Sequence, residues 1–485
     1  MKTLLERAKG SPLDIFADST DPVGTVALLS PHTKQITSLI LPFRSWADIR
    51  RFSELDSGPL PLLRTLVIDE ISHKRSDARV IPRSFLLFGN AVNLQKFRLR
   101  SIGSQFLNHF VFPNLTSVDL FVTKVEGFRA SQLLGFLKAS PTLQVVCLNI
   151  ATNILFDFTP RERAVVLPNV ESLCLVVSDV EPGYNLVTHI SCPVVKRTSL
   201  TYGKDVVDST PLNIFPPASW NAIARQYTRS PIEEVTLVIK MSWKSILACQ
   251  LTFQSPDKTI IRLCFEVNSK GRNRNDEMYY GVFSQASRTI RDIPQLANVK
   301  RLHIHHTSPA SKYIHVAPII SEVGRLFQSL GPLEILTLYH CDMRPYFAPS
   351  VVFPPIEELT ILHPFYSPPL SPPRENFEAA MVGLAESQHA LGVPFGHVTV
   401  RMGNLPKGMA ERLRPWVGAG DCYNERYEGD YHDKRNVGSC YIQQYGGDLY
   451  DRPCAADFYN KPRAVNYWYS CLSACMCTPI IIQLA

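Results

Sequence analysis

The sequence predicts an α/β solenoid, in which short parallel strands form a concave sheet and helices or loops lie on the convex side. Three observations support this prediction: an apolar hexamer recurs along the chain, Pro or Asn opens most of its copies, and helical patterns separate them. The clearest copy begins at Leu333 and is apolar at its first, fourth and sixth positions, Leu333, Leu336 and Leu338. This spacing is the strand signature of a leucine-rich repeat.

Thirteen copies of the hexamer start between 21 and 39 residues apart, so the repeat is irregular and has variable insertions. Their first residues are Ile36, Leu63, Leu94, Leu115, Leu143, Val170, Val195, Ile232, Ile260, Val299, Leu333, Ile356 and Phe395. A short strand cannot bury its apolar side alone, and stacking such strands builds one long parallel sheet. Unrelated buried strands of a doubly wound fold would also give apolar runs between helices, but thirteen copies exceed the usual strand number of an open sheet.

The ninth position of each copy departs from the tight form of the repeat. In that form an Asn or Cys side chain satisfies backbone groups in the turn. Only Asn268 and Cys341 fit here, whereas residues such as Thr123 and Ala151 occupy the other places. We therefore expect a loose horseshoe whose turns differ from copy to copy.

The chain in order predicts a cap, the repeats and a tail. Residues 1–30 read as a helix followed by a poorly formed strand at 13–15, which could cap the open end of the core. Residues 31–420 hold the irregular repeats, with helical patterns near 45–55, 131–137, 219–227, 319–330 and 376–391. The alternation of strand and helix indicates a parallel sheet with the helices outside.

The last segment, 421–485, differs in composition, since it contains six of the twelve cysteines and nine of the eighteen tyrosines. Zinc binding is one interpretation, but only Cys471, Cys475 and Cys477 lie close together, and paired ligands should occur twice. We expect a disordered tail or a misplaced reading frame, and no metal site.

Composition restricts the function classes. A net charge of +7 over 485 residues, without a concentrated basic stripe, does not indicate a nucleic-acid binder. The N-terminus lacks the apolar core of a signal peptide, and no apolar run reaches the length of a membrane helix. Single cysteines scattered through the repeats agree with a reducing compartment. We expect a cytoplasmic or nuclear protein that does not bind a membrane.

The spacings that carry catalysis or cofactor binding are absent: no nucleophile elbow, no His-Glu-x-x-His, no phosphate loop and no dinucleotide fingerprint. We therefore expect no enzyme activity and no cofactor. The repeat surface is the better candidate, because solenoids present a long concave face to a partner.

The concave face carries the third, fifth and seventh positions of each copy, since side chains alternate along a strand. The basic and aromatic residues at these positions form a candidate partner-binding strip, which consists of Lys96, Arg98, Arg100, Arg301, His303, His305, Tyr339 and Arg401. Arg side chains there could hold an acidic or phosphorylated segment. An ordinary solvated sheet face is the alternative.

The opening of the chain adds a resemblance. Leu5-Glu6-Arg7-Ala8-Lys9-Gly10-Ser11-Pro12-Leu13-Asp14-Ile15, followed by the hexamers, resembles the F-box proteins with irregular leucine-rich repeats of mushroom-forming (basidiomycete) fungi. The resemblance covers residues 1 to about 418. In that family the F-box docks on a Skp-type adaptor of a cullin ubiquitin ligase, and the repeats choose the protein to be ubiquitylated. The F-box should precede Leu5, where only four residues stand, so no adaptor-contact residue is carried over.

The sequence thus predicts a protein-interaction module that resembles the substrate-recognition part of an F-box subunit. A stand-alone scaffold without a link to ubiquitin is the first alternative, and it would bind its target without any adaptor. An enzyme with an unrecognised site is the second, and it would need a deep pocket with convergent titratable groups.

Overall fold

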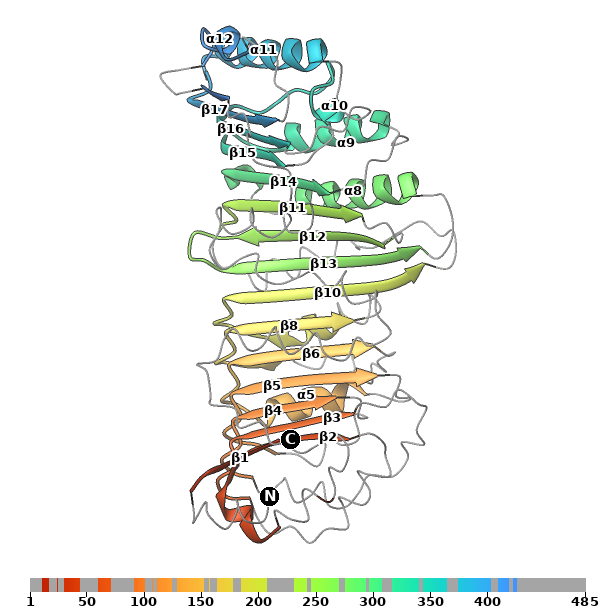
Figure 1. Cartoon of the computed structure of the whole chain (residues 1–485), viewed down its shortest axis with the longest axis vertical. Coiled ribbons are helices and arrows are strands. Elements are labelled where there is room, and N and C mark those ends of the chain that lie inside the picture. Colours follow the sequence, from red (N-terminus) through yellow and green to blue (C-terminus); the bar gives the residue numbers. More distant parts are fainter. Residues whose placement is uncertain are drawn as a thin grey trace, which may run out of the picture. The chain divides into compact units, whose positions relative to one another are not determined.

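A computed structural model describes the parts of the chain that carry the repeats. These residues are 11–16, 24, 30–43, 60–70, 91–100, 107, 111–123, 129–151, 157, 164–177, 185–206, 231–241, 246–269, 275–293, 296–307, 316–339, 343–363, 374–402, 409–417 and 422–424. They form two compact units, an N-terminal unit up to Gly203 and a C-terminal unit from Lys204. Each unit combines helices with a largely parallel sheet, which confirms the predicted α/β class (Figure 1).

The N-terminal unit places eight parallel strands side by side in chain order (Figure 1). They are β1 (Leu13–Phe16), β2 (Ile36–Phe43), β3 (Thr65–Glu70), β4 (Lys96–Arg100), β5 (Ser117–Thr123), β6 (Val145–Ala151), β8 (Ser172–Val177) and β10 (Arg197–Val206). A 3-10 helix (Ser30–Gln35) precedes β2, helix α5 (Ala130–Lys138) precedes β6, and β7 (Val165–Val166) pairs with β9 (Ile190–Ser191). The strand expected at 13–15 is therefore β1.

The C-terminal unit orders its strands β13-β12-β11-β14-β15-β16-β17-β18. Their bounds are β11 (Glu234–Met241), β12 (Ile246–Gln254), β13 (Ile260–Ser269), β14 (Arg301–Thr307), β15 (Leu333–Tyr339), β16 (Ile356–His363), β17 (His397–Met402) and β18 (Cys422–Asn424). The helices are α8 (Asn275–Arg291), a 3-10 turn (Leu296–Asn298), α9 (Val316–Ser329), α10 (Met343–Tyr346), α11 (Arg374–Ala390) and α12 (Met409–Leu413). Strands β11 and β14 to β18 are parallel to their neighbours in this series.

The hexamer accounts for the core of both units. In twelve of the thirteen copies the first, fourth and sixth residues are all buried. The fourth and sixth residues also pair in register from strand to strand, as Leu66 with Phe97 and Ile68 with Leu99. The same register links β2 through β10 in one unit, and β11 through β14 to β17 in the other. Each copy thus adds one layer of apolar side chains to the core of its own unit.

The copy that starts at Ile260 corrects the prediction of an all-parallel sheet. Its strand, β13, is antiparallel to β12, and β12 is antiparallel to β11. The five residues between β12 and β13, 255–259, are too few for the crossover that parallel neighbours require, so the chain returns as a hairpin. Lys258 takes a positive φ of 64° in this turn.

Three of the five expected helices are present as α5, α9 and α11, whereas the patterns near 45–55 and 219–227 lie outside the described residues. Helix α8 was not predicted, although Tyr279, Val282, Phe283, Ala286 and Ile290 give it a buried stripe of helical spacing. Strand β18 adds residues 422–424 to the sheet at the start of the predicted tail. The rest of that tail, with its other five cysteines, lies outside the described residues.

The N-terminal unit has a polar ladder that the sequence did not reveal. The residue just before the hexamer donates a side-chain hydrogen bond to a backbone carbonyl of the preceding copy. The bonds run from Asn93 to Pro61 (2.7 Å), Asn114 to Val92 (2.8 Å), Thr142 to Pro113 (2.9 Å) and Asn169 to Pro141 (3.0 Å). The turns are therefore more regular than the ninth position led us to expect, because the linking residue sits before the strand.

Candidate functional site

The open face of each sheet, which we define as the third, fifth and seventh positions of the copies, is the candidate site. The helices pack on the other face: Phe136 of α5 packs against Phe97 at a fourth position, with ring centroids 6.3 Å apart. In the C-terminal unit Phe283 of α8 contacts His306 at an eighth position, with centroids 5.6 Å apart. Since side chains alternate along a strand, the open face points away from these helices.

On the open face of the N-terminal unit, the predicted residues Lys96, Arg98 and Arg100 stand on β4. The next strand brings Asp119 opposite Arg98, and Arg98 Nε lies 2.8 Å from Asp119 Oδ2. The two side chains are only 11% and 16% exposed, which reduces the screening of this ion pair by water. The centre of the predicted basic strip is thus neutralised within the protein.

The same row continues with two cysteines. Cys147 pairs in register with Asp119 on one side and with Cys174 on the other. Hydrogen bonding to Cys174 and burial raise the pKa of the Cys147 thiol well above its usual value, so it stays protonated at neutral pH. The row offers a polar but largely uncharged continuation of the Arg98–Asp119 pair.

In the C-terminal unit, β14 and β15 bring together Arg301, His303, His305 and Tyr339. His305 lies opposite Tyr339, and their rings pack against each other at a tilt of 42°, with centroids 5.1 Å apart. Tyr339 is half-buried, and burial raises the pKa of its phenol, which therefore remains neutral. A partly buried aromatic pair of this kind is typical of a contact surface.

Two acidic residues at the start of β11, Glu234 and the preceding Glu233, balance the predicted basic ones here as well. Arg301 Nε lies 3.0 Å from Glu234 Oε2, and its Nη1 lies 3.6 Å from Glu233 Oε1. Burial lowers the pKa of His303, although the Glu234 carboxylate 3.9 Å away opposes the shift, so the ring is neutral at pH 7. The face carries alternating charges rather than one basic strip.

The last predicted residue, Arg401, lies on β17 in register with Leu362, and its side chain is outside the described residues. Because the predicted residues fall in two units, the structure groups Lys96 with Arg98 and Arg100, and Arg301 with His303, His305 and Tyr339. Sequence reasoning missed Asp119, Glu233 and Glu234. Comparing equal positions of adjacent copies would have found Asp119, since it occupies the fifth position, as Arg98 does.

Comparison of the chain with protein-family models, with curated proteins and with solved structures found no match. Within the described residues, no three His, Cys, Asp or Glu side chains gather in a way that could hold a metal ion. No described helix is long and apolar enough to cross a membrane. The cysteines whose side chains the structure describes, Cys147, Cys174, Cys192, Cys249 and Cys264, carry no disulfide.

Proposed function

We propose that this chain is an irregular leucine-rich-repeat solenoid that binds a protein partner through its open faces. The observation that carries the proposal is the register: equal positions of successive copies pair across the strands, so that open-face side chains form continuous rows. The helices pack against the opposite face. A repeat protein built in this way offers a long, preorganised surface for recognition.

The chemistry of the rows favours a partner surface of mixed polarity. Arg98 and Arg301 are held by carboxylates of neighbouring strands, so an acidic segment would have to compete with Asp119 or Glu234 for them. The adjacent rings of His305 and Tyr339 supply a contact with both apolar and hydrogen-bonding character. We infer that these aromatic rings anchor the partner and that the paired charges fix its orientation.

The resemblance to fungal F-box proteins with leucine-rich repeats suggests the class of complex. In that family the repeats select the protein to be ubiquitylated, and partner proteins carry out the transfer. Leu13, Asp14 and Ile15 of the resembling stretch lie in β1, which pairs with β2 and so joins this stretch to the repeat sheet. We propose the role of substrate receptor, with the stand-alone scaffold as its alternative.

Quantitative affinity capture tests the open-face proposal with two face variants. The first carries Arg98→Ala, Arg100→Ala, Arg301→Ala and His303→Ala, and the second carries His305→Ala and Tyr339→Ala and leaves both ion pairs intact. A control variant replaces exposed cations away from the open face by Ala, at Lys138, Lys196, Arg288 and Arg414. All variants should retain the far-ultraviolet circular dichroism of the unchanged chain.

We expect proteins captured by the unchanged chain to be depleted at least about tenfold by both face variants, because each removes contact side chains from the open faces. The control variant should retain them. Equal capture by all variants would contradict the open-face proposal. A Skp-type adaptor and cullin among the captured proteins would favour the substrate receptor, whereas targets captured without them would favour the stand-alone scaffold.

A further inference from the structure

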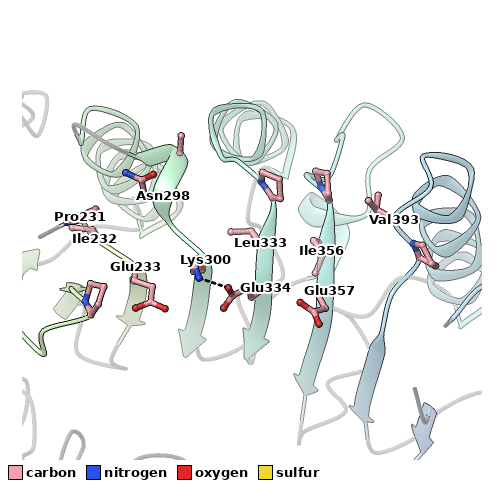
Figure 2. A pocket seen from close by; sticks show the side chains of 15 residues that line it. Pro231, Ile232, Glu233, Asn298, Lys300, Leu333, Glu334, Ile356, Glu357 and Val393 are labelled. Carbon is pink, nitrogen blue, oxygen red and sulfur yellow. Dashed lines mark ion pairs between the residues drawn. The ribbon is translucent and has the colours of Figure 1, made fainter. Parts of the chain in front are cut away.

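The C-terminal unit carries a groove of about 800 Å³ that does not belong to the open face. It crosses the points where β11, β14, β15, β16 and β17 begin, and each strand contributes residues from the same place in its copy (Figure 2). Its apolar lining includes Pro231, Pro256, Pro332, Pro355, Pro394 and Val393. Four of these prolines are exposed, so their rings present apolar surface to water.

A row of charges lies along the same groove, at the second position of the copies. Glu233, Lys300, Glu334 and Glu357 follow one another on successive strands (Figure 2). Lys300 Nζ lies 2.7 Å from Glu334 Oε1, and its hydrogen bond to this carboxylate raises the pKa of Lys300. Glu357 is exposed and forms no ion pair with any other described residue. Glu233 also faces Arg301 Nη1 at 3.6 Å, so Lys300 is the cation that remains for Glu334 and Glu357 in the groove lining.

Negative charge in the row is least compensated at Glu334 and Glu357. Their strands pair in register, so the two residues stand about 4.8 Å apart along the sheet, and only Lys300 offsets them within the groove. A guanidinium or ammonium group placed between the two carboxylates would form charge-assisted hydrogen bonds. Phosphate groups would be repelled, which excludes nucleic acid as the occupant.

We propose that this groove binds an extended polypeptide segment in which an Arg or Lys is flanked by apolar side chains. The cation lies on Glu334 and Glu357, and the apolar side chains contact the proline rings. The five strand starts span about 19 Å, which matches five or six extended residues. Proline fixes the backbone of the groove, so the groove itself loses little conformational entropy when the segment binds.

Side chains carry this recognition, because three backbone amides at the strand starts are already hydrogen bonded. The amide of Lys300 donates to Glu233 O (2.8 Å), that of Glu334 donates to Lys300 O (2.7 Å), and that of Gly396 donates to Glu357 O (2.8 Å). The segment therefore does not join the sheet as a further strand. Its specificity depends on the position of its cation relative to its apolar residues.

A random heptapeptide library displayed on phage tests the proposal with the full chain as bait. We expect the selected peptides to be enriched in Arg or Lys next to Leu, Ile, Phe or Val. A fluorescein-labelled selected peptide should bind at least about tenfold more weakly to the Glu334→Gln/Glu357→Gln double variant, because both partners of its cation lose their charge. Glu171→Gln is the matched control, since Glu171 is exposed at the same strand position in the N-terminal unit.

The proposal is overturned if no peptide is enriched, if the enriched peptides lack a cation, or if the double variant binds them as well as the unchanged chain does. A peptide with Gly in place of its apolar residues should also lose affinity; undiminished binding would overturn the role of the prolines. The His305→Ala/Tyr339→Ala variant should bind the peptide normally, because neither residue lines the groove. This test therefore fails or succeeds independently of the function proposed above.

Discussion

The two units connect the same repeat in different ways. In the N-terminal unit, Asn or Thr side chains before the strands bond each copy to the one before it, as Asn114 does to Val92 O. In the C-terminal unit, prolines occupy most of the corresponding places and offer no donor. There Gln388, a buried residue of α11, donates to Pro354 O (3.1 Å) and accepts from the amide of Ile356 (3.2 Å). A helix side chain thus replaces the ladder.

The difference extends to the layer behind the sheet. Helices α8 and α9 of the C-terminal unit are joined by Glu322, which is 2% exposed and lies 3.1 Å from both Arg291 and Arg325. His306 lies beneath them between two phenols, 2.6 Å from Tyr279 Oη and 3.3 Å from Tyr346 Oη. The hexamer therefore sets the strands, and either edge side chains or packed helices hold successive copies together.

Replacing Glu322 should lower the free energy of unfolding more than any other change proposed below. Glu322→Ala leaves Arg291 without its carboxylate in the interface between α8 and α9, and we expect a loss of about 3 kcal/mol in the free energy of unfolding. Arg325→Ala is the control, because this side chain is 55% exposed and its loss should cost less than about 1 kcal/mol. Urea unfolding followed by circular dichroism measures both. Equal effects would show that the helix interface does not depend on the buried charge.

The buried imidazole predicts a pH dependence of the C-terminal unit. Burial lowers the pKa of His306 to about 3, whereas the unfolded chain has the usual value near 6.5. Below pH 6.5 the unfolded state therefore binds a proton that the folded state does not, and stability falls as the pH falls. We expect the unchanged chain to lose about 1.4 kcal/mol per pH unit more than His306→Gln between pH 6 and pH 4. Parallel curves for the two proteins would contradict a neutral, buried His306.

The edge ladder of the N-terminal unit should give the smallest effect. Asn114→Ala removes one hydrogen bond at an exposed position, so we expect a loss of about 1 kcal/mol. Gln144→Ala is the matched control, since Gln144 is also exposed near the start of a strand and bonds to its neighbours through its backbone. Thermal unfolding of both variants measures the difference. If Gln144→Ala cost as much, the ladder would not be what links the copies.

The strands could be predicted because the apolar spacing of the hexamer is local in the sequence. The same spacing recurs in every copy, and stacking the copies buries its apolar residues. The helical stripe of α8 carried the same kind of signal, but its mixed Tyr, Val, Phe and Ala residues are less apolar than the stripe of α9. The hexamer at Ile260 has the same pattern as the parallel copies and therefore predicts a parallel strand. The turn residues Pro256 and Asp257 directly before it are the local signal of the β12–β13 hairpin.

The candidate site was predicted only in part. Alternation along the strand placed Arg98, Arg301 and Tyr339 on one side of their sheets, and this needs no knowledge of neighbours. Their partners Asp119 and Glu234 depend on which residues of adjacent copies stand opposite each other, and that register emerges only when the copies stack. The groove was missed for the same reason, because each strand contributes a single proline or carboxylate, and one such residue does not predict a binding site.

The register of the copies is the claim on which both proposed surfaces depend, and cross-linking of engineered thiols tests it most directly. Thr337→Cys and Thr360→Cys place two thiols in register on the open face, where neighbouring strands bring their Cα atoms within the range of a disulfide. Thr337→Cys with Glu357→Cys displaces one thiol by three residues along its strand. After mild oxidation with copper phenanthroline and proteolysis, mass spectrometry should find the linkage between 337 and 360 and none between 337 and 357. A linkage in the displaced pair, or none in the aligned pair, would contradict the stacked register and the open face built on it.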